Sequence, residues 1–258
     1  MLKCTDSHCH LDVEEFSDDR EEVIARALES GVARMLLPAI DLPSSKRVIA
    51  LSESHQGVLY PMIGLHPEEV RADWREQLDA IKQLLQPQVI AIGEVGLDFY
   101  WSREYEHEQL EAFEQQVQWS VETRLPLMIH CRKAQNELVK LLRRYEHDLP
   151  GGVFHCFTGN EREAAEFLQF ERFLLGVGGV LTFRKNPLPQ VLPSVVPLDR
   201  IIRETDSPYM APVPMRGKRN EPSFVRFVLQ RMAEAYGVSE EEMATRCEEN
   251  VDRVFAFQ

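Results

Sequence analysis

The sequence predicts a single (β/α)8 barrel, the TIM-barrel fold, spanning residues 1–258. Short apolar runs typical of strands alternate with amphipathic stretches typical of helices, and this alternation implies parallel strands joined by helical crossovers. Eight such runs occur in 258 residues, which matches the usual size of this barrel. No low-complexity linker or change in composition marks a boundary between two domains.

The eight expected strands are spaced along the whole chain. They cover residues 4–8, 34–39, 59–65, 89–94, 127–131, 152–156, 173–177 and 200–204. Side chains able to bind a metal ion end six of these runs. An open, doubly wound sheet is the alternative, but such a sheet gathers its site at one switch point. The spread of these strand ends therefore favours a closed ring.

Amphipathic stretches between the strands are expected to form helices. They cover residues 19–30, 77–85, 106–123, 135–145 and 161–169, and residues 223–236 and 239–255 form two closing helices. Ser239 and Glu242 resemble a capping box at the start of the last helix. Residues 208–222 contain four prolines and a basic run, and we expect a loop there at the mouth of the barrel.

Composition limits the classes of function. The chain is 44% hydrophobic and 28% charged, as is usual for a globular protein, and its formal net charge is −13. This acidity argues against a broad basic surface that follows duplex nucleic acid. It leaves room for a small anionic substrate whose charge is met by metal ions in a cleft.

Five cysteines occur without paired spacing, so neither a disulfide framework nor a structural zinc knuckle is expected. Reduced thiols in the cytoplasm fit this usage better. Residues 1–4 lead straight into the first strand without a signal-peptide pattern. No apolar run approaches 18 residues, so we expect no transmembrane segment. Nothing in the sequence indicates an obligate protein partner.

The first candidate metal ligands are His8 and His10, which follow the first strand. Residues two apart on an extended chain point to the same side, so both imidazoles can face one centre. Asp6 could orient one of these imidazoles. The alternative is a polar loop with two surface histidines.

Glu94 directly follows four apolar residues, where a carboxylate is costly unless it is paired or bound to metal. A carboxylate can bridge two cations, whereas an imidazole cannot. A salt bridge to an arginine is the alternative. His130 and His155 end the fifth and sixth strands, and each could instead be a core histidine with satisfied hydrogen bonds.

Asp206 ends the eighth strand and would lie beside the first strand in a closed ring. It is expected to be a metal ligand or the base that activates water. We therefore predict two divalent ions with Glu94 shared, and nitrogen and oxygen ligands suit Zn, Mn, Mg or Ni. The first predicted site comprises His8, His10, Glu94 and Asp206, and the second comprises Glu94, His130 and His155.

Substrate contacts are predicted around this centre. His66 ends the third strand, further from the centre, and either contacts a substrate phosphate or is a structural turn residue. Arg132 and Lys133 either meet a phosphate or form solvated salt bridges. The candidate base-stacking residues, which could equally pack loops, are Phe99, Tyr100, Trp101 and Tyr209. The remaining histidines, expected at the surface, are His55, His107 and His147.

Seven sequence blocks, in order along nearly the whole chain, resemble the TatD family of metal-dependent deoxyribonucleases. They are Asp6-Ser7-His8-Cys9-His10-Leu11, Gly64-Leu65-His66-Pro67, Gly93-Glu94-Val95-Gly96-Leu97-Asp98, His130-Cys131-Arg132, His155-Cys156-Phe157-Thr158-Gly159, Glu204-Thr205-Asp206-Ser207-Pro208-Tyr209 and Arg216-Gly217-Lys218-Arg219-Asn220-Glu221-Pro222.

The resemblance implies a TIM barrel of the amidohydrolase kind that hydrolyses phosphodiesters. It implies removal of nucleotides from the 3′ end of single-stranded DNA, with RNA left open, in DNA repair or turnover. The family's ligands fall on the six predicted positions, and a further site histidine falls on His66.

A lactonase or another small-molecule hydrolase of the same barrel is the main rival. Binuclear enzymes of that kind often use a modified lysine at the end of the fourth strand, where this chain has Glu94. A binding protein that merely keeps the barrel is a second rival, and six ligand candidates argue against it.

Overall fold

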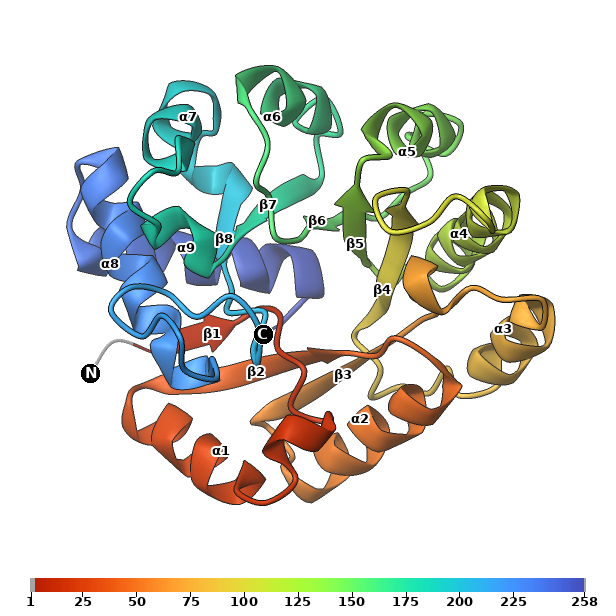
Figure 1. The fold of residues 1–258 in the computed structure, drawn as a ribbon, viewed down its shortest axis with the longest axis horizontal. Coiled ribbons are helices and arrows are strands. Elements are labelled where there is room, and N and C mark those ends of the chain that lie inside the picture. Colours follow the sequence, from red (N-terminus) through yellow and green to blue (C-terminus); the bar gives the residue numbers. More distant parts are fainter. Residues whose placement is uncertain (1–2, 258) are drawn as a thin grey trace.

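A computed structural model describes residues 3–257, which form one barrel of eight parallel strands in consecutive order (Figure 1). The helices form an outer ring around the strands. The predicted (β/α)8 fold is confirmed. The expected domain over residues 1–258 also includes residues 1, 2 and 258, which lie outside the described residues, as does part of the expected N-terminal run at residues 1–4.

All eight expected strands are present, with some shifted ends. The strands are β1 (Cys4–Asp6), β2 (Val32–Pro38), β3 (Leu59–Ile63), β4 (Ala91–Asp98), β5 (Leu127–Arg132), β6 (Gly152–Phe154), β7 (Phe173–Val177) and β8 (Ile201–Arg203). The expected end of β4 at Glu94 was wrong, because the strand continues for four more residues. A register irregularity between Ile92 and Val95 precedes this second part, which pairs with β5.

Helices connect the strands and close the chain. They are α1 (Arg20–Glu29), α2 (Leu42–Ser54), α3 (Trp74–Lys82), α4 (Glu106–Thr123), α5 (Gln135–Leu142), α6 (Glu161–Phe167), α7 (Leu188–Val195), α8 (Val225–Tyr236) and α9 (Glu240–Phe255). Short 3-10 turns occupy η1 (Glu14–Phe16), η2 (Pro67–Glu69), η3 (Gly179–Thr182), η4 (Leu198–Arg200) and η5 (Pro222–Phe224).

Two of these helices, α2 and α7, were not predicted. Helix α2 begins with a capping box between Asp41 and Ser44, which was a readable signal. Helix α7 contains Pro193, a residue that normally argues against a helix interior. At the start of α9, the Ser239 side chain accepts a hydrogen bond from the Glu242 backbone N–H at 3.1 Å, which is one half of the expected box.

The ring closes between β8 and β1 through backbone hydrogen bonds beyond the regular ladder. Asp206 N–H donates to the His8 carbonyl at 2.9 Å, and His10 N–H donates to the Ser207 carbonyl at 2.8 Å. The predicted adjacency of Asp206 to His8 and His10 is therefore confirmed. These bonds fix the two loops that carry half of the predicted metal ligands.

An apolar cluster fills the barrel beneath its carboxyl end. Each strand from β2 to β8 contributes one buried side chain: Leu36, Met62, Ala91, Met128, Val153, Leu174 and Ile202. Val251 and Phe255 of α9 join the same cluster. Dense apolar packing below the site leaves its open side at the strands' carboxyl ends, where chemistry occurs in this fold.

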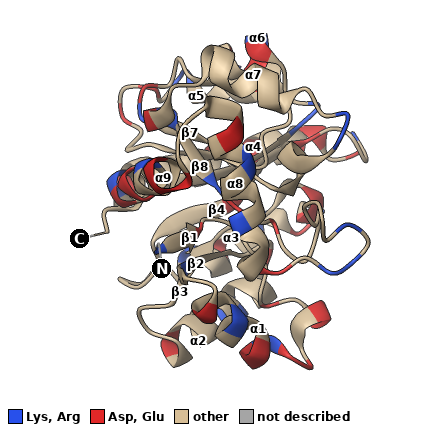
Figure 2. Cartoon of the chain, turned by 90° about the vertical axis from the view of Figure 1, so that its left-hand side faces the viewer, with Lys and Arg blue, Asp and Glu red and all other residues tan. Residues whose placement is uncertain are grey.

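The basic loop at residues 208–222 is tied to the body of the molecule. Arg219 contacts Asp19 through two hydrogen bonds of 2.8 and 2.7 Å, and the Asn220 side-chain amide donates to the Thr205 carbonyl at 2.9 Å. Figure 2 shows basic and acidic residues mixed along α9 rather than separated. None of the helices in residues 3–257 has the length and apolar character needed to cross a bilayer.

Candidate metal centre

The structure brings the six predicted metal ligands together at the carboxyl ends of the strands. Five are buried and the sixth, His130, is partly buried. They come from five of the eight strands or the loops that follow them: His8 and His10 after β1, Glu94 in β4, His130 in β5, His155 after β6 and Asp206 after β8.

One group of donor atoms surrounds Oε2 of Glu94. This oxygen lies 3.2 Å from Nε2 of His8 and 3.5 Å from Nε2 of His10, and the two nitrogens are 3.2 Å apart. Oδ1 of Asp206 lies 3.7 and 3.6 Å from the same two nitrogens. Two imidazole nitrogens that face each other between carboxylates form a donor set suited to a divalent cation.

A second group surrounds Oε1, the other oxygen of Glu94. Nε2 of His155 lies 2.8 Å away, Nδ1 of His130 lies 3.1 Å away, and Nε2 of His66 lies 3.3 Å away. The two carboxylate oxygens therefore face two different sets of nitrogens, which is the arrangement that a bridging ligand requires.

His66 lies closer to the centre than expected. Its ring is buried, contacts Glu94 and packs edge-on against His130 with ring centroids 4.5 Å apart. The expectation of a more distant residue was wrong because β3 is the neighbour of β4 in the barrel. His66, which follows β3, therefore lies beside Glu94 of β4. Burial lowers the pKa of His66 below its usual value, which favours the neutral imidazole.

Two carboxylates that were not predicted support the histidines from outside. Oδ2 of Asp98 lies 2.9 Å from Nε2 of His130, and Oε1 of Glu204 lies 3.4 Å from Nδ1 of His155. Carboxylates in this position orient metal-binding imidazoles and fix their tautomer. A signal for Asp98 existed, because it stands four residues after Glu94 and alternation along β4 puts both on the same side.

The expected role of Asp6 was wrong. Its carboxylate accepts hydrogen bonds from the Thr205 backbone N–H at 2.9 Å and from the Thr205 hydroxyl at 2.5 Å, so it joins the loops after β1 and β8. The Asp6 carboxylate therefore binds a hydroxyl and not an imidazole. Nδ1 of His8, whose ring was one of the two that Asp6 could orient, is buried without a hydrogen-bond partner among the described residues. Burial raises the pKa of Asp6 to about 7.

Electrostatics keep the carboxylates of both predicted acidic ligands, Glu94 and Asp206, ionised. Burial alone would raise the pKa of Glu94, but the facing imidazoles of His155 and His66 outweigh it and hold that pKa well below its usual value. For Asp206, burial is outweighed by the hydrogen bond to His10, and its pKa is also lowered. Burial and the neighbouring His155 lower the pKa of His8, which keeps this imidazole available as a donor of a lone pair.

Close backbone packing shapes the centre. Gly96 has a φ of +144°, and a Cβ there would lie 1.9 Å from the His130 carbonyl oxygen. A Cβ on Gly176 would lie 2.3 Å from Oε2 of Glu204. Asp206 itself has a φ of +56°, a conformation that non-glycine residues rarely adopt and that clusters at functional sites.

A cavity of about 580 Å³ opens over the two donor groups and has Trp101 and Tyr209 on its walls. Both aromatic side chains are more than half exposed, at 65% and 51%. The guanidinium of Arg132 stacks 3.8 Å from the ring of Tyr100. Phe99 is buried, so it cannot stack on a base as considered above.

The three histidines expected at the surface lie outside the centre. His107 and His147 are exposed, whereas His55 is partly buried and its Nε2 lies 2.9 Å from Oε2 of Glu21. The expectation therefore holds fully for His107 and His147, whereas His55 is partly covered where it contacts Glu21 of α1.

Comparisons with known proteins agree with this geometry. The family model described as "TatD related DNase" matches residues 5–256. The Bacillus subtilis protein named uncharacterized metal-dependent hydrolase YabD is 38% identical over 251 residues, covering 97% of this chain and 98% of its own length. The 3′-5′ ssDNA/RNA exonuclease TatD of Cronobacter sakazakii is 34% identical over 247 residues, covering 93% of each chain.

A solved structure is also similar to this chain over its whole length. The crystal structure of YJJV, a TatD homologue from Escherichia coli, superposes with a TM-score of 0.91 at 30% identity and covers 100% of this chain and 99% of that one. The resemblance seen in the seven sequence blocks is confirmed. The chain belongs to the TatD-related DNase family and is a metal-dependent hydrolase.

Proposed function

We propose that this protein is a 3′-5′ exonuclease that removes nucleotides from the end of single-stranded DNA and also accepts RNA. The observation that carries the proposal is the division of the Glu94 carboxylate between two sets of nitrogens. Relatives named 3′-5′ ssDNA/RNA exonucleases, 33–34% identical to this chain, support the choice of substrate.

The chain has the donors to hold two divalent ions, Mg, Mn, Zn or Ni. His8, His10, Glu94 and Asp206 would hold one, and Glu94, His130 and His155 would hold the other. Bound together, such ions supply Lewis acidity for displacement at phosphorus and offset the charge that develops there. The donor set fits this role because it contains only nitrogen and oxygen atoms. Cys131 and Cys156 line the cavity but belong to neither donor group.

The protein groups have separate tasks around the scissile phosphate. Asp206, held ionised, accepts the proton of the attacking water. Glu94 links the two donor groups, because each of its oxygens faces one of them. His66, buried and neutral, donates its N–H to a phosphate oxygen or to the leaving oxygen, and Arg132 at the rim meets the phosphate charge.

An assay with 3′- and 5′-labelled single strands across a panel of divalent metals tests this function. We expect mononucleotide release from the 3′ end that requires added metal. Release from the 5′ end would reverse the proposed polarity. No release with any metal, together with turnover of a lactone, would instead identify a small-molecule hydrolase.

We also propose that the enzyme works in the cytoplasm in DNA repair or turnover, as a single domain over residues 1–258 and without an obligate protein partner. All five cysteines are free thiols, which fits a reducing compartment. Expression as a fluorescent fusion with fractionation tests the location.

A further inference from the structure

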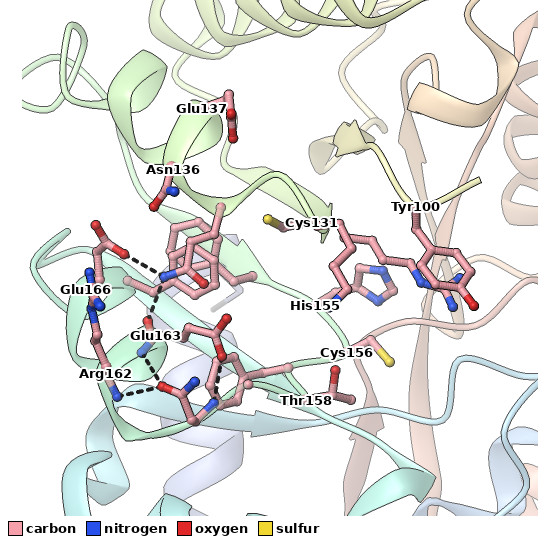
Figure 3. Close-up of a pocket in the computed structure, with 18 of the residues that line it drawn as sticks. Tyr100, Cys131, Asn136, Glu137, His155, Cys156, Thr158, Arg162, Glu163 and Glu166 are labelled. Atoms are coloured by element: carbon pink, nitrogen blue, oxygen red, sulfur yellow. Dashed lines mark hydrogen bonds between the residues drawn. The ribbon is translucent and has the colours of Figure 1, made fainter. Parts of the chain in front are cut away.

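A second groove, of about 700 Å³, runs from the metal cavity between the loops that follow β5 and β6. Arg132, His155 and Cys156 line both hollows, so the groove lies next to the metal cavity. Figure 3 shows His155 and Tyr100 at one end of the groove and Arg162 at the other. Nothing in the metal centre uses the far end.

Four exposed cations line this groove: Arg103, whose guanidinium lies 2.9 Å from Oε2 of Glu106, and the three cations Arg132, Lys133 and Arg162. Among residues 3–257, none of the three forms an ion pair, although most arginines elsewhere in the described chain do. The groove therefore offers unpaired positive charge in a protein whose net charge is −13.

Two of the three acidic side chains that line the groove, Glu163 and Glu166, are engaged by the protein. Oε2 of Glu163 accepts a hydrogen bond from the Asn160 backbone N–H at 2.8 Å, as part of the capping box of α6. Oε2 of Glu166 accepts one from the Gln135 amide at 2.7 Å. These bonds turn both carboxylates toward the protein. Glu137 is the third carboxylate on the groove wall, so three unpaired cations face one carboxylate that no hydrogen bond or ion pair within residues 3–257 engages.

Aromatic side chains stand where the groove meets the metal cavity. Tyr100 is 50% exposed and Trp101 is 65% exposed, and their rings pack edge to face with centroids 4.9 Å apart. The Arg132 guanidinium lies 3.8 Å from the first ring centroid and 5.1 Å from the second. Exposed rings beside a cationic groove form the combination that binds single-stranded nucleic acid through base stacking and backbone charge.

We infer that this groove binds the nucleotides on the 5′ side of the scissile bond, while the 3′ end occupies the metal cavity. The inference rests on the proposed exonuclease function. The bases stack at Tyr100 and Trp101, and the phosphates that follow meet Lys133 and Arg162. The ligand is a flexible single strand, because its bases must be unpaired to stack on these rings.

Substrate length tests the groove. The Michaelis constant KM is measured for a dinucleotide and for a ten-nucleotide strand, in the wild type and in the double variant Lys133→Ala/Arg162→Ala. We expect the wild type to bind the longer strand more tightly, and the double variant to lose about tenfold of that advantage. Lys140→Ala, on the same helix as Gln135 but outside the groove, is the matched control and should retain it.

Salt dependence gives an independent measurement. Binding of a phosphorothioate ten-nucleotide strand is followed by fluorescence anisotropy at several salt concentrations. Loss of two phosphate contacts should make the slope of log K against log salt about 1.4 units less negative, since each contact on a single strand contributes about 0.7.

The outcomes separate this inference from the proposed function. If the wild type hydrolyses single strands and the double variant keeps both the length advantage and the salt slope, the groove assignment is wrong and the exonuclease function stands. If the wild type hydrolyses no strand but binds the ten-nucleotide probe through Lys133 and Arg162, the proposed function fails and the groove remains a nucleic-acid site. Absence of both hydrolysis and binding overturns both.

Discussion

Oε1 of Glu94 lies 2.8 Å from Nε2 of His155, while the other oxygen of the same carboxylate lies 3.2 Å from Nε2 of His8. The His8 and His155 rings themselves stack with centroids 3.9 Å apart. Glu94 therefore lies between two sets of predicted ligands that are already in contact. Its negative charge faces both sets.

Removing this charge should abolish hydrolysis. In Glu94→Gln the shape is kept but both donor sets lose the carboxylate charge that they share, so we expect activity on single strands to fall by orders of magnitude. Glu76→Gln, an exposed change on α3, is the control and should leave activity unchanged. Equal rates for Glu94→Gln and wild type, measured at saturating metal, would remove Glu94 from the centre.

Glu204 should act through His155. We expect Glu204→Gln to weaken metal binding or activity by about 10- to 100-fold, because the imidazole loses the carboxylate that orients it. Isothermal titration with Mn separates this role from a purely structural one, because a folded variant with unchanged metal affinity would contradict it. Asp98→Asn tests the matching contact to His130.

Gly96 should tolerate no side chain. Gly96→Ala places a Cβ against the His130 carbonyl and strains the backbone, and we expect a loss of at least about 1–3 kcal/mol in the free energy of unfolding. Gly57→Ala is the control: its φ is also positive, at +79°, but no atom lies within 4 Å of the added Cβ. Similar denaturation midpoints for the two variants would show that the close approach to β5 is unimportant.

Stability should depend on Glu221 in acid. Burial raises its pKa, but the hydrogen bonds from Arg26 outweigh burial and lower that pKa below its usual value of 4.5. The ion pair between Arg26 and Glu221 therefore stabilises the fold fully above about pH 4.5, the usual pKa of the carboxyl group. This stabilisation is lost as the pH falls through the lowered pKa of the folded state.

Because Arg26 is 44% exposed, we expect Glu221→Gln to cost only about 1 kcal/mol at pH 7. The difference from wild type should vanish in acid, which urea unfolding at several pH values measures. A difference that is constant between pH 7 and pH 3 would contradict the ion pair.

Much of the fold could be predicted because apolar runs and helical stretches alternate regularly. The alternation cannot reveal α7, where prolines interrupt an apolar helix, or the extension of β4 beyond Glu94, which depends on an irregular register with β5. The convergence of the six predicted ligands was predictable because strand ends in a barrel meet around one centre.

Other parts of the centre depend on contacts that sequence spacing does not encode. Asp6 was expected beside an imidazole, but Thr205 lies closer in the closed ring. His66 was expected to be distant because its contact with Glu94 depends on the paths of two neighbouring strands. The groove is formed by loops after β5 and β6, whose side chains meet only in three dimensions.

A metal titration of metal-stripped protein, with single-strand hydrolysis followed at each step, tests the two-ion centre directly. We predict no hydrolysis without metal, full activity near two equivalents of divalent ion per chain, and fewer bound equivalents in Glu94→Gln. Undiminished hydrolysis by the metal-stripped protein would contradict the two-ion centre.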